Sequence, residues 1–169
     1  GELTRLGSAT ERLRVLRDLA VDQCWQLRFN AELAQTDAVD FVEHILVRGL
    51  SARHIVVGED FRFGAKRLGD TALLRSLGNK HGFQLHVANA VSLDGERISS
   101  TRIRSALEMG DVGQVRRLLG RPFRMTGRVH RGQQLGRDLG YPTANIAFPG
   151  NSKPPLVGIY AVRARLHSA

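Results

Sequence analysis

The stretch HIVVGEDFRFGAKRLGD, residues 54–70, joins a short apolar run to a loop rich in charge, aromatic rings and glycine. Residues 54–58 have the length and the β-branched content of a buried strand, and Asp70 is placed to cap a helix over residues 71–82. Residues 83–91 then have the composition of a second strand. A strand, a helix and a second strand in this order predict a parallel pair joined by a crossover helix.

The same alternation extends toward the N-terminus. Residues 9–20 carry leucines at helical spacing, with Thr10 available as a cap. Residues 24–29, CWQLRF, are typical of a short strand. Thr36 is then placed to cap a helix with an apolar stripe, which Gly49 can end.

Toward the C-terminus, Asp94-Gly95 is a strong hairpin turn signal, and it is followed by helical patterns over residues 98–109 and 111–120. Strands that alternate with helices are typical of α/β folds, in which helices cover a parallel sheet. The sequence therefore predicts an α/β domain with a doubly wound parallel sheet over residues 1–119.

The pattern changes at residues 118–123, LLGRPF, because Gly120 and Pro122 cannot continue a helix. Beyond this boundary, short alternating runs separated by Gly/Pro turns predict antiparallel β-structure, a barrel, for residues 120–169. Three strands cannot close a barrel, and the first half begins on a helix where a doubly wound sheet normally begins on a strand. We therefore expect a fragment that is incomplete at both ends.

The composition limits the partners of the chain. Twenty-five basic and sixteen acidic residues give a net charge of +9. This excess leaves open a basic nucleic-acid-binding module, but the arginines are spread along the chain and the aromatic residues, 6% of it, form no stacking series. We therefore expect no nucleic-acid partner. With no apolar run long enough to cross a bilayer, no apolar secretory core, and Cys24 as the single cysteine, we expect a cytoplasmic protein without membrane contact or internal disulfides.

The first candidate site is ISSTRIRSAL, residues 98–107. Ser99, Ser100 and Thr101 fall at the predicted N-terminus of a helix, where free N–H groups and the helix dipole favour an anion. Arg104 lies one turn further on. Two interpretations remain open: an ordinary N-cap, or a site for phosphates. A cap needs only one hydroxyl.

The second candidate site is the loop after the strand at residues 54–58, because ligands of open α/β sheets bind at the carboxyl ends of the strands. A flat aromatic ligand can pack on phenylalanine rings there, although one of the two rings can equally close the core beneath the loop. The loop carries the aromatic residues Phe61 and Phe63 beside the basic residues Arg62, Lys66 and Arg67.

The third candidate site includes LGRDLGYPTANIAF, residues 135–148. On a strand, Thr143 and Asn145 share one face, and their oxygens can complete a magnesium–nucleotide site together with phosphate oxygens and water. Gly132 allows close backbone approach, and Arg137 supplies a cation. Glycines also serve ordinary turns, so spacing alone leaves this site open.

Taken in order, the motifs VGEDFRFGAKRLGD, ISSTRIRSALEMGDV, LLGRPF and GRVHRGQQLGRDLGYPTANI closely resemble the bacterial bifunctional riboflavin kinase/FMN adenylyltransferase family, also called FAD synthetase. The resemblance runs over essentially the whole chain. It implies a Rossmann-like nucleotidyltransferase domain, which makes FAD from FMN and ATP, over residues 1–119. It also implies a β-barrel kinase domain, which makes FMN from riboflavin and ATP, over residues 120–169.

The resemblance also implies roles for individual residues, with small-molecule nucleotides and flavins as the partners. ATP phosphates would be bound by Ser100, Thr101 and Arg104 in the first domain and by Gly132 and Arg137 in the second. The flavin would be bordered by Asp60, Phe61 and Phe63, and Mg²⁺ would be ligated by Thr143 and Asn145.

Two parts of the family pattern do not occur in the chain. These are the Gly-x-Phe-Asp and His-x-Gly-His motif of the nucleotidyltransferase, and the catalytic glutamate expected on a later strand of the kinase barrel. No catalytic residue is therefore assigned, and we expect the chain alone to complete neither active site. A flavin-binding remnant without catalysis remains an alternative.

Overall fold

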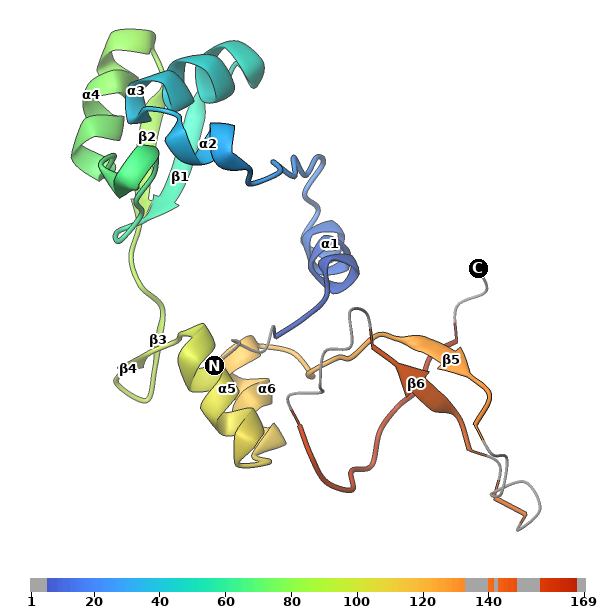
Figure 1. Cartoon of the computed structure of the whole chain (residues 1–169). Helices are drawn as coiled ribbons and strands as arrows, with labels where there is room; N and C mark the ends of the chain where they lie inside the picture. The colour runs from blue at the N-terminus through green and yellow to red at the C-terminus, as the bar shows by residue number, and fades with distance from the viewer. Residues whose placement is uncertain (1–5, 133–139, 142, 149–155, 167–169) are drawn as a thin grey trace. The chain divides into compact units, whose positions relative to one another are not determined.

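The computed structural model describes residues 6–132, 140–141, 143–148 and 156–166. The chain divides into two compact units, residues 25–97 and residues 1–24 with 98–169. The helices and strands (Figure 1) are α1 (Ala9–Asp18), α2 (Ala31–Gln35), α3 (Ala38–Asp40), the π-helix η1 (Phe41–Gly49), β1 (His54–Gly58), the 3-10 helix η2 (Ala65–Arg67), α4 (Thr71–His81), β2 (Gln84–Ala88), β3 (Ser92–Leu93), β4 (Glu96–Arg97), α5 (Ser100–Glu108), α6 (Val112–Leu119), β5 (Arg128–His130) and β6 (Asn145–Ala147).

Strands β1 and β2 form a parallel pair, with His54 opposite Gln84 at one end and Gly58 opposite Ala88 at the other. Helix α4 connects them and packs on β2 (Figure 1). The strand, helix and strand predicted from the sequence are therefore confirmed. Within the described residues this sheet has two strands, so a parallel sheet is present but a wider, doubly wound one is not seen.

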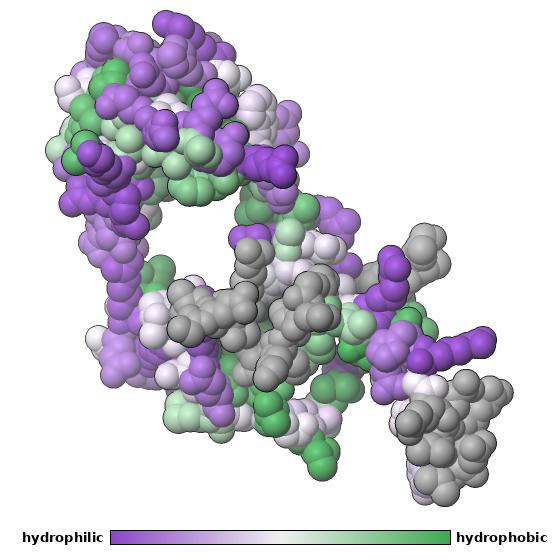
Figure 2. Space-filling model, in the orientation of Figure 1, coloured by the Kyte–Doolittle hydropathy of each residue, from purple (hydrophilic) through white to green (hydrophobic). Residues whose placement is uncertain are grey.

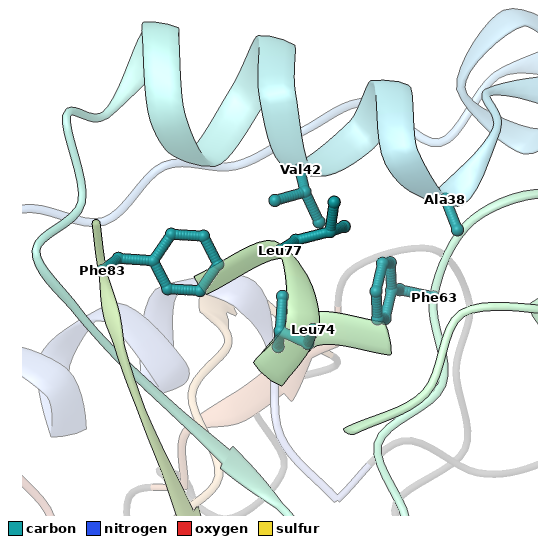
Figure 3. Packing of buried hydrophobic residues seen from close by; sticks show 6 residues of the cluster. All are labelled: Ala38, Val42, Phe63, Leu74, Leu77 and Phe83. Carbon is teal, nitrogen blue, oxygen red and sulfur yellow. The ribbon is translucent and has the colours of Figure 1, made fainter. Parts of the chain in front are cut away.

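The core of this unit lies between α4 and the continuous helix formed by α3 and η1. One face of the sheet packs against this core through Ile55, Val57 and Leu85, because side chains alternate between the two faces of a strand. Figure 3 shows the buried side chains from the two helices and the adjoining segments, which are Ala38, Val42, Phe63, Leu74, Leu77 and Phe83.

Both ends of α4 follow from local sequence signals. The Asp70 carboxylate accepts a hydrogen bond from the backbone N–H of Leu73 at 2.9 Å, which confirms the predicted cap. At the other end, Gly82 adopts a left-handed conformation with φ of 79°. A residue without a Cβ adopts this conformation at little cost, so glycine is the favoured residue at this position.

Two predicted caps are wrong by one or two residues. Ser8, not Thr10, caps α1, because Ser8 is extended and its hydroxyl accepts from the N–H of Glu11 at 3.1 Å. Asp37, not Thr36, caps the helix that begins with α3. Polar residues one or two positions apart compete for the same cap, and the sequence does not show which one has the extended backbone that capping requires.

The predicted strand over residues 24–29 is also wrong, since this segment has no regular structure. Its apolar residues at alternate positions include Trp25, which is 58% exposed, and Phe29, which is 81% exposed. Alternation shows that a segment fits a half-buried strand, but a strand also needs a neighbour that pairs with its backbone. Within the described part of the chain, no strand pairs with these residues.

The second unit contains the helical hairpin formed by α5 and α6. Its buried side chains are Ile103, Ala106, Leu107, Val115 and Leu118. Gly120 ends α6 in a left-handed conformation with φ of 66°, at the position where the sequence predicts the helical pattern to stop.

Strands β5 and β6 are antiparallel, as predicted, and His130 pairs with Asn145. The antiparallel strands predicted beyond residue 120 do not extend to residues 158–166, which have no regular structure, so the prediction is wrong there. The hairpin predicted at Asp94-Gly95 is confirmed by the antiparallel pair β3 and β4.

On the face seen in Figure 2, hydrophilic residues cover much of the part that holds α4, β1 and β2. Among the helices that the structure describes, none combines the length and the apolar character needed to span a membrane.

Candidate functional site

The loop between β1 and α4 is held in one conformation by backbone hydrogen bonds. The N–H of Phe61 donates to the carbonyl of Gly58 at 3.1 Å, which turns the chain directly after the strand. Phe63 and Gly69 then form an antiparallel bridge, with N–H to carbonyl distances of 3.1 and 2.9 Å. This loop lies at the carboxyl end of a parallel strand, where α/β sheets bind their ligands.

The two phenylalanines of this loop stack on each other, with ring centroids 5.5 Å apart and an angle of 20° between the rings. Phe63 is only 6% exposed and belongs to the core, where Figure 3 shows it between Ala38 and Leu74. Phe61 is half-buried and packs on the edge of that core. The interpretation that one ring closes the core therefore holds for Phe63, and Phe61 is the more accessible ring.

Asp60, beside these rings, makes an ion pair with Arg97 of β4, and the donor and acceptor atoms are 2.7 Å apart. The hydrogen bond and charge of Arg97 hold the pKa of the Asp60 carboxyl below its usual range. The sequence did not single out Arg97. Nothing in the pattern before ISSTRIR distinguishes this arginine from others, because its partner is 37 residues away.

At the N-terminus of α5, one hydroxyl caps the helix and two do not. Ser99 is extended, and its Oγ accepts from the N–H of Arg102 at 3.2 Å. Ser100 and Thr101 lie in the first turn with exposed side chains, and Arg104 follows one turn later. The N-cap interpretation therefore holds for Ser99, and phosphate binding by Ser100 and Thr101 stays a prediction.

Three residues of the third candidate site lie on or next to strands β5 and β6. Because His130 pairs with Asn145, continuing the register places Gly132 opposite Thr143, and side chains at all four positions would point to one face. A Cβ at Gly132 would lie 3.1 Å from Cγ of Asn145, so glycine lets the chain pass close to that amide. Thr143 and Asn145 are both exposed.

The predicted site residues that the structure describes fall into three groups. Asp60, Phe61 and Phe63 lie together in the unit of residues 25–97. Ser100, Thr101 and Arg104 on α5, and Gly132, Thr143 and Asn145 at β5 and β6, belong to the other unit. Arg137 lies outside the described residues.

Two family models match the chain one after the other. Residues 1–102 match the family model for FAD synthetase, and residues 119–169 match the family model for riboflavin kinase. The bifunctional riboflavin kinase/FMN adenylyltransferase of Pseudomonas fluorescens is 45% identical over 161 residues, which are 92% of this chain and 51% of that protein. The Haemophilus influenzae protein of the same name is 38% identical over 164 residues, 97% of this chain and 53% of that protein.

Among solved structures, a protein from Streptococcus pneumoniae described as a macrolide-efflux protein matches with a TM-score of 0.75 and 31% identity. The match covers 90% of this chain and 49% of that one. Its name differs from those of the curated relatives, so the comparison carries the fold alone. The chain spans about half the length of the relatives it matches. The family model that covers residues 1–102 decides the classification: the chain belongs to the FAD synthetase family.

Proposed function

We propose that the protein containing this chain phosphorylates riboflavin to FMN and then adenylylates FMN to FAD, with ATP as the donor in both steps. The observation that carries this proposal is the succession, in one chain, of a FAD synthetase match and a riboflavin kinase match. The candidate sites support it, because an aromatic loop and the first residues of α5, where free N–H groups favour an anion, lie in the first match. The two exposed oxygen donors Thr143 and Asn145 lie in the second.

In the adenylyltransferase step, a phosphate oxygen of FMN attacks the α-phosphorus of ATP, and pyrophosphate leaves. We assign Asp60, Phe61 and Phe63 to the border of the flavin site. Phe61 offers its ring to the flavin, while Phe63, stacked behind it at 5.5 Å, fixes the angle of that ring. Asp60 is kept ionised by Arg97 and can accept a hydrogen bond from the flavin.

Ser100, Thr101 and Arg104 would bind the phosphates of ATP in the same step. The first-turn N–H groups of α5 and the positive end of its dipole favour the charge that develops on the leaving pyrophosphate. The Arg104 guanidinium, one turn further on, supplies a full positive charge. The chain would thus act mainly by positioning the reactants and neutralising charge.

In the kinase step, the 5′-hydroxyl of riboflavin attacks the γ-phosphorus of ATP. Gly132 and Arg137 would lie over the phosphates. The Thr143 hydroxyl and the Asn145 amide oxygen suit Mg²⁺, a hard cation that takes one or two protein oxygens beside phosphate oxygens and water. Bound there, Mg²⁺ would neutralise charge on the phosphates. Gly132 leaves room for the Asn145 amide, since a side chain at this position would meet it.

Three further expectations accompany this proposal. The first is a boundary between residues 119 and 120 that separates a Rossmann-like domain from a β-barrel domain. The second is a cytoplasmic location, where ATP and flavins are both available. The third is that the present 169 residues alone make neither FMN nor FAD.

Product analysis with and without Mg²⁺ tests the proposed function directly. The whole protein would be incubated with riboflavin and ATP, and the flavins would be separated by chromatography. We expect FMN first and FAD later, and we expect excess EDTA to stop FMN formation until Mg²⁺ is added back. Absence of flavin products, or an unchanged rate of FMN formation in EDTA, would contradict the proposal.

A further inference from the structure

Two neighbouring basic residues of the loop between β1 and α4 have a backbone conformation that side chains disfavour. Lys66 has φ of 53° and Arg67 has φ of 59°. In this left-handed region a Cβ is too close to the following carbonyl oxygen, whereas glycine is tolerated. Neither residue contributes to the core, because both are exposed.

The surrounding loop fixes this conformation from three directions. Phe63 and Gly69 pair on either side of the two residues. The N–H of Ala65 donates to the carbonyl of Thr36 at 2.7 Å. Gly64 lies so close to helix α3 that a Cβ added to it would be 2.6 Å from Cα of Ala38. The two side chains are therefore presented by a rigid backbone rather than by a loose turn.

Unfavourable backbone conformations held by well-determined surroundings cluster at ligand-binding sites. Glycine would relieve the strain at positions 66 and 67, and the same loop already has glycine at positions 64 and 69. Two cations at these positions therefore have no structural explanation in the packing of the loop. A role for their charges accounts for the residue types.

These cations lie on the same loop as the candidate flavin site, between β1 and α4. Asp60 is paired mainly with Arg97, and the charge of Arg67 also acts on the same carboxylate, so Arg67 lies near the border of that site. Phe61, on the same loop, offers its half-buried ring. A loop that carries an accessible aromatic ring and two exposed cations suits a planar ligand with a phosphate group.

We propose that Lys66 and Arg67 bind the phosphomonoester of FMN and thereby select FMN over riboflavin at the site bordered by Phe61. This inference rests on the proposed function and adds a selectivity element to it. The two flavins share the same ring system and differ in the phosphate, so only contacts to that phosphate can separate them. The phosphate groups of ATP could bind the same two cations, so the test measures ATP binding separately.

The test is a binding titration of the full chain with FMN, riboflavin and ATP, each followed separately by calorimetry. The main variant is Lys66→Gly/Arg67→Gly, which removes both charges and relieves the backbone. The conservative variant Lys66→Arg/Arg67→Lys keeps the charges. The matched control is Arg48→Gln/Arg75→Gln, which removes two exposed charges from helices η1 and α4 of the same unit.

The wild-type chain should bind FMN more tightly than riboflavin. The double glycine variant should lose at least about tenfold in FMN affinity, because it loses two charge-assisted contacts. Its riboflavin and ATP affinities should not change, and its Tm should not fall, since glycine suits both positions. The conservative variant and the matched control should bind FMN as the wild type does.

An unchanged FMN affinity in the double glycine variant would overturn the inference. An equal loss of riboflavin affinity would also overturn it, because the effect would then come from the ring site. Loss of ATP affinity alone would assign the cations to the nucleotide instead. If the wild type binds riboflavin and FMN equally, the selectivity is absent and the inference fails, but the proposed function stands. If the chain binds neither flavin, the inference fails, and the product analysis of the whole protein decides the proposed function separately.

Discussion

Phe61 and Phe63 are two residues apart, yet they differ in what a substitution should do. Phe63 is buried among the side chains of α3, η1 and α4, whereas Phe61 covers the edge of that core. We expect Phe63→Ala to lower the free energy of unfolding by about 3–5 kcal/mol, and Phe61→Ala to cost less. Phe61→Ala should instead weaken flavin binding.

Chemical denaturation and flavin titration of both variants measure these effects. Phe61→Leu is the matched control for lost volume, because it keeps an apolar side chain without a ring. Equal losses of stability in the two alanine variants, or normal flavin affinity in Phe61→Ala, would contradict the assigned roles.

The three hydroxyls before α5 offer a second comparison between single residues. Ser99→Ala removes the N-cap and should destabilise the protein by about 0.5–2 kcal/mol. Ser100→Ala should leave stability unchanged, because the cap is intact, and should weaken ATP binding. Urea denaturation and ATP titration separate the two effects. Loss of ATP affinity in neither variant would remove α5 from the nucleotide site.

For single residues, the sequence predicted the kinds of residue at a site better than the separate role of each one. A serine before a helix is an adequate signal for a cap, but three hydroxyls in a row give no signal for which one caps. Arg97 was missed for a related reason. Its partner Asp60 is distant in sequence, and only folding brings the two together.

Helices η1 and α4 are joined by an ion-pair group at the surface. The Glu43 carboxylate of η1 accepts from Lys80 Nζ at 3.1 Å and lies 3.1 Å from His81 Nε2, both on α4. The hydrogen bond and charge of Lys80, and to a smaller extent His81, hold the pKa of the Glu43 carboxyl below its usual range. The group connects two elements that also share the core.

The lowered pKa makes the contribution of Glu43 dependent on pH. A carboxyl whose pKa is lower in the folded state stabilises the fold above its unfolded pKa, and this stability is lost as pH falls through the folded pKa. We therefore expect Glu43→Gln to lower Tm at neutral pH and to have a vanishing effect at acidic pH. Thermal unfolding across the acid range checks this, with Glu108→Gln as an exposed control on α5. A difference in Tm that persists in acid would contradict the ion-pair origin.

Among the elements, those with local signals were predicted well. The strand at residues 54–58 and helix α4 have their caps, spacing and turn residues within the segment itself. The segment at residues 24–29 has the alternation of a strand but lacks a pairing partner in the described chain. Pairing is a property of two segments, so one segment's pattern cannot establish it.

For the whole molecule, the order of the parts carries more information than any one motif. Scattered glycines, a serine-rich helix start and an aromatic loop each have an ordinary structural explanation. Their succession over nearly the whole chain resembles the family, and the matches over residues 1–102 and 119–169 support the same assignment. The spacing of Thr143 and Asn145 predicts that they share one face of a strand. It does not show whether that face binds a ligand.

The central claim is that two chemically separate sites lie along this sequence, and the most direct test is a paired assay of Thr143→Ala in the whole protein. Riboflavin phosphorylation and FMN adenylylation would be measured separately, with Thr101→Ala as the reciprocal variant. We predict that Thr143→Ala abolishes Mg²⁺-dependent FMN formation and spares FAD formation from FMN, whereas Thr101→Ala does the reverse. Equal loss of both activities in Thr143→Ala would contradict the two-site account.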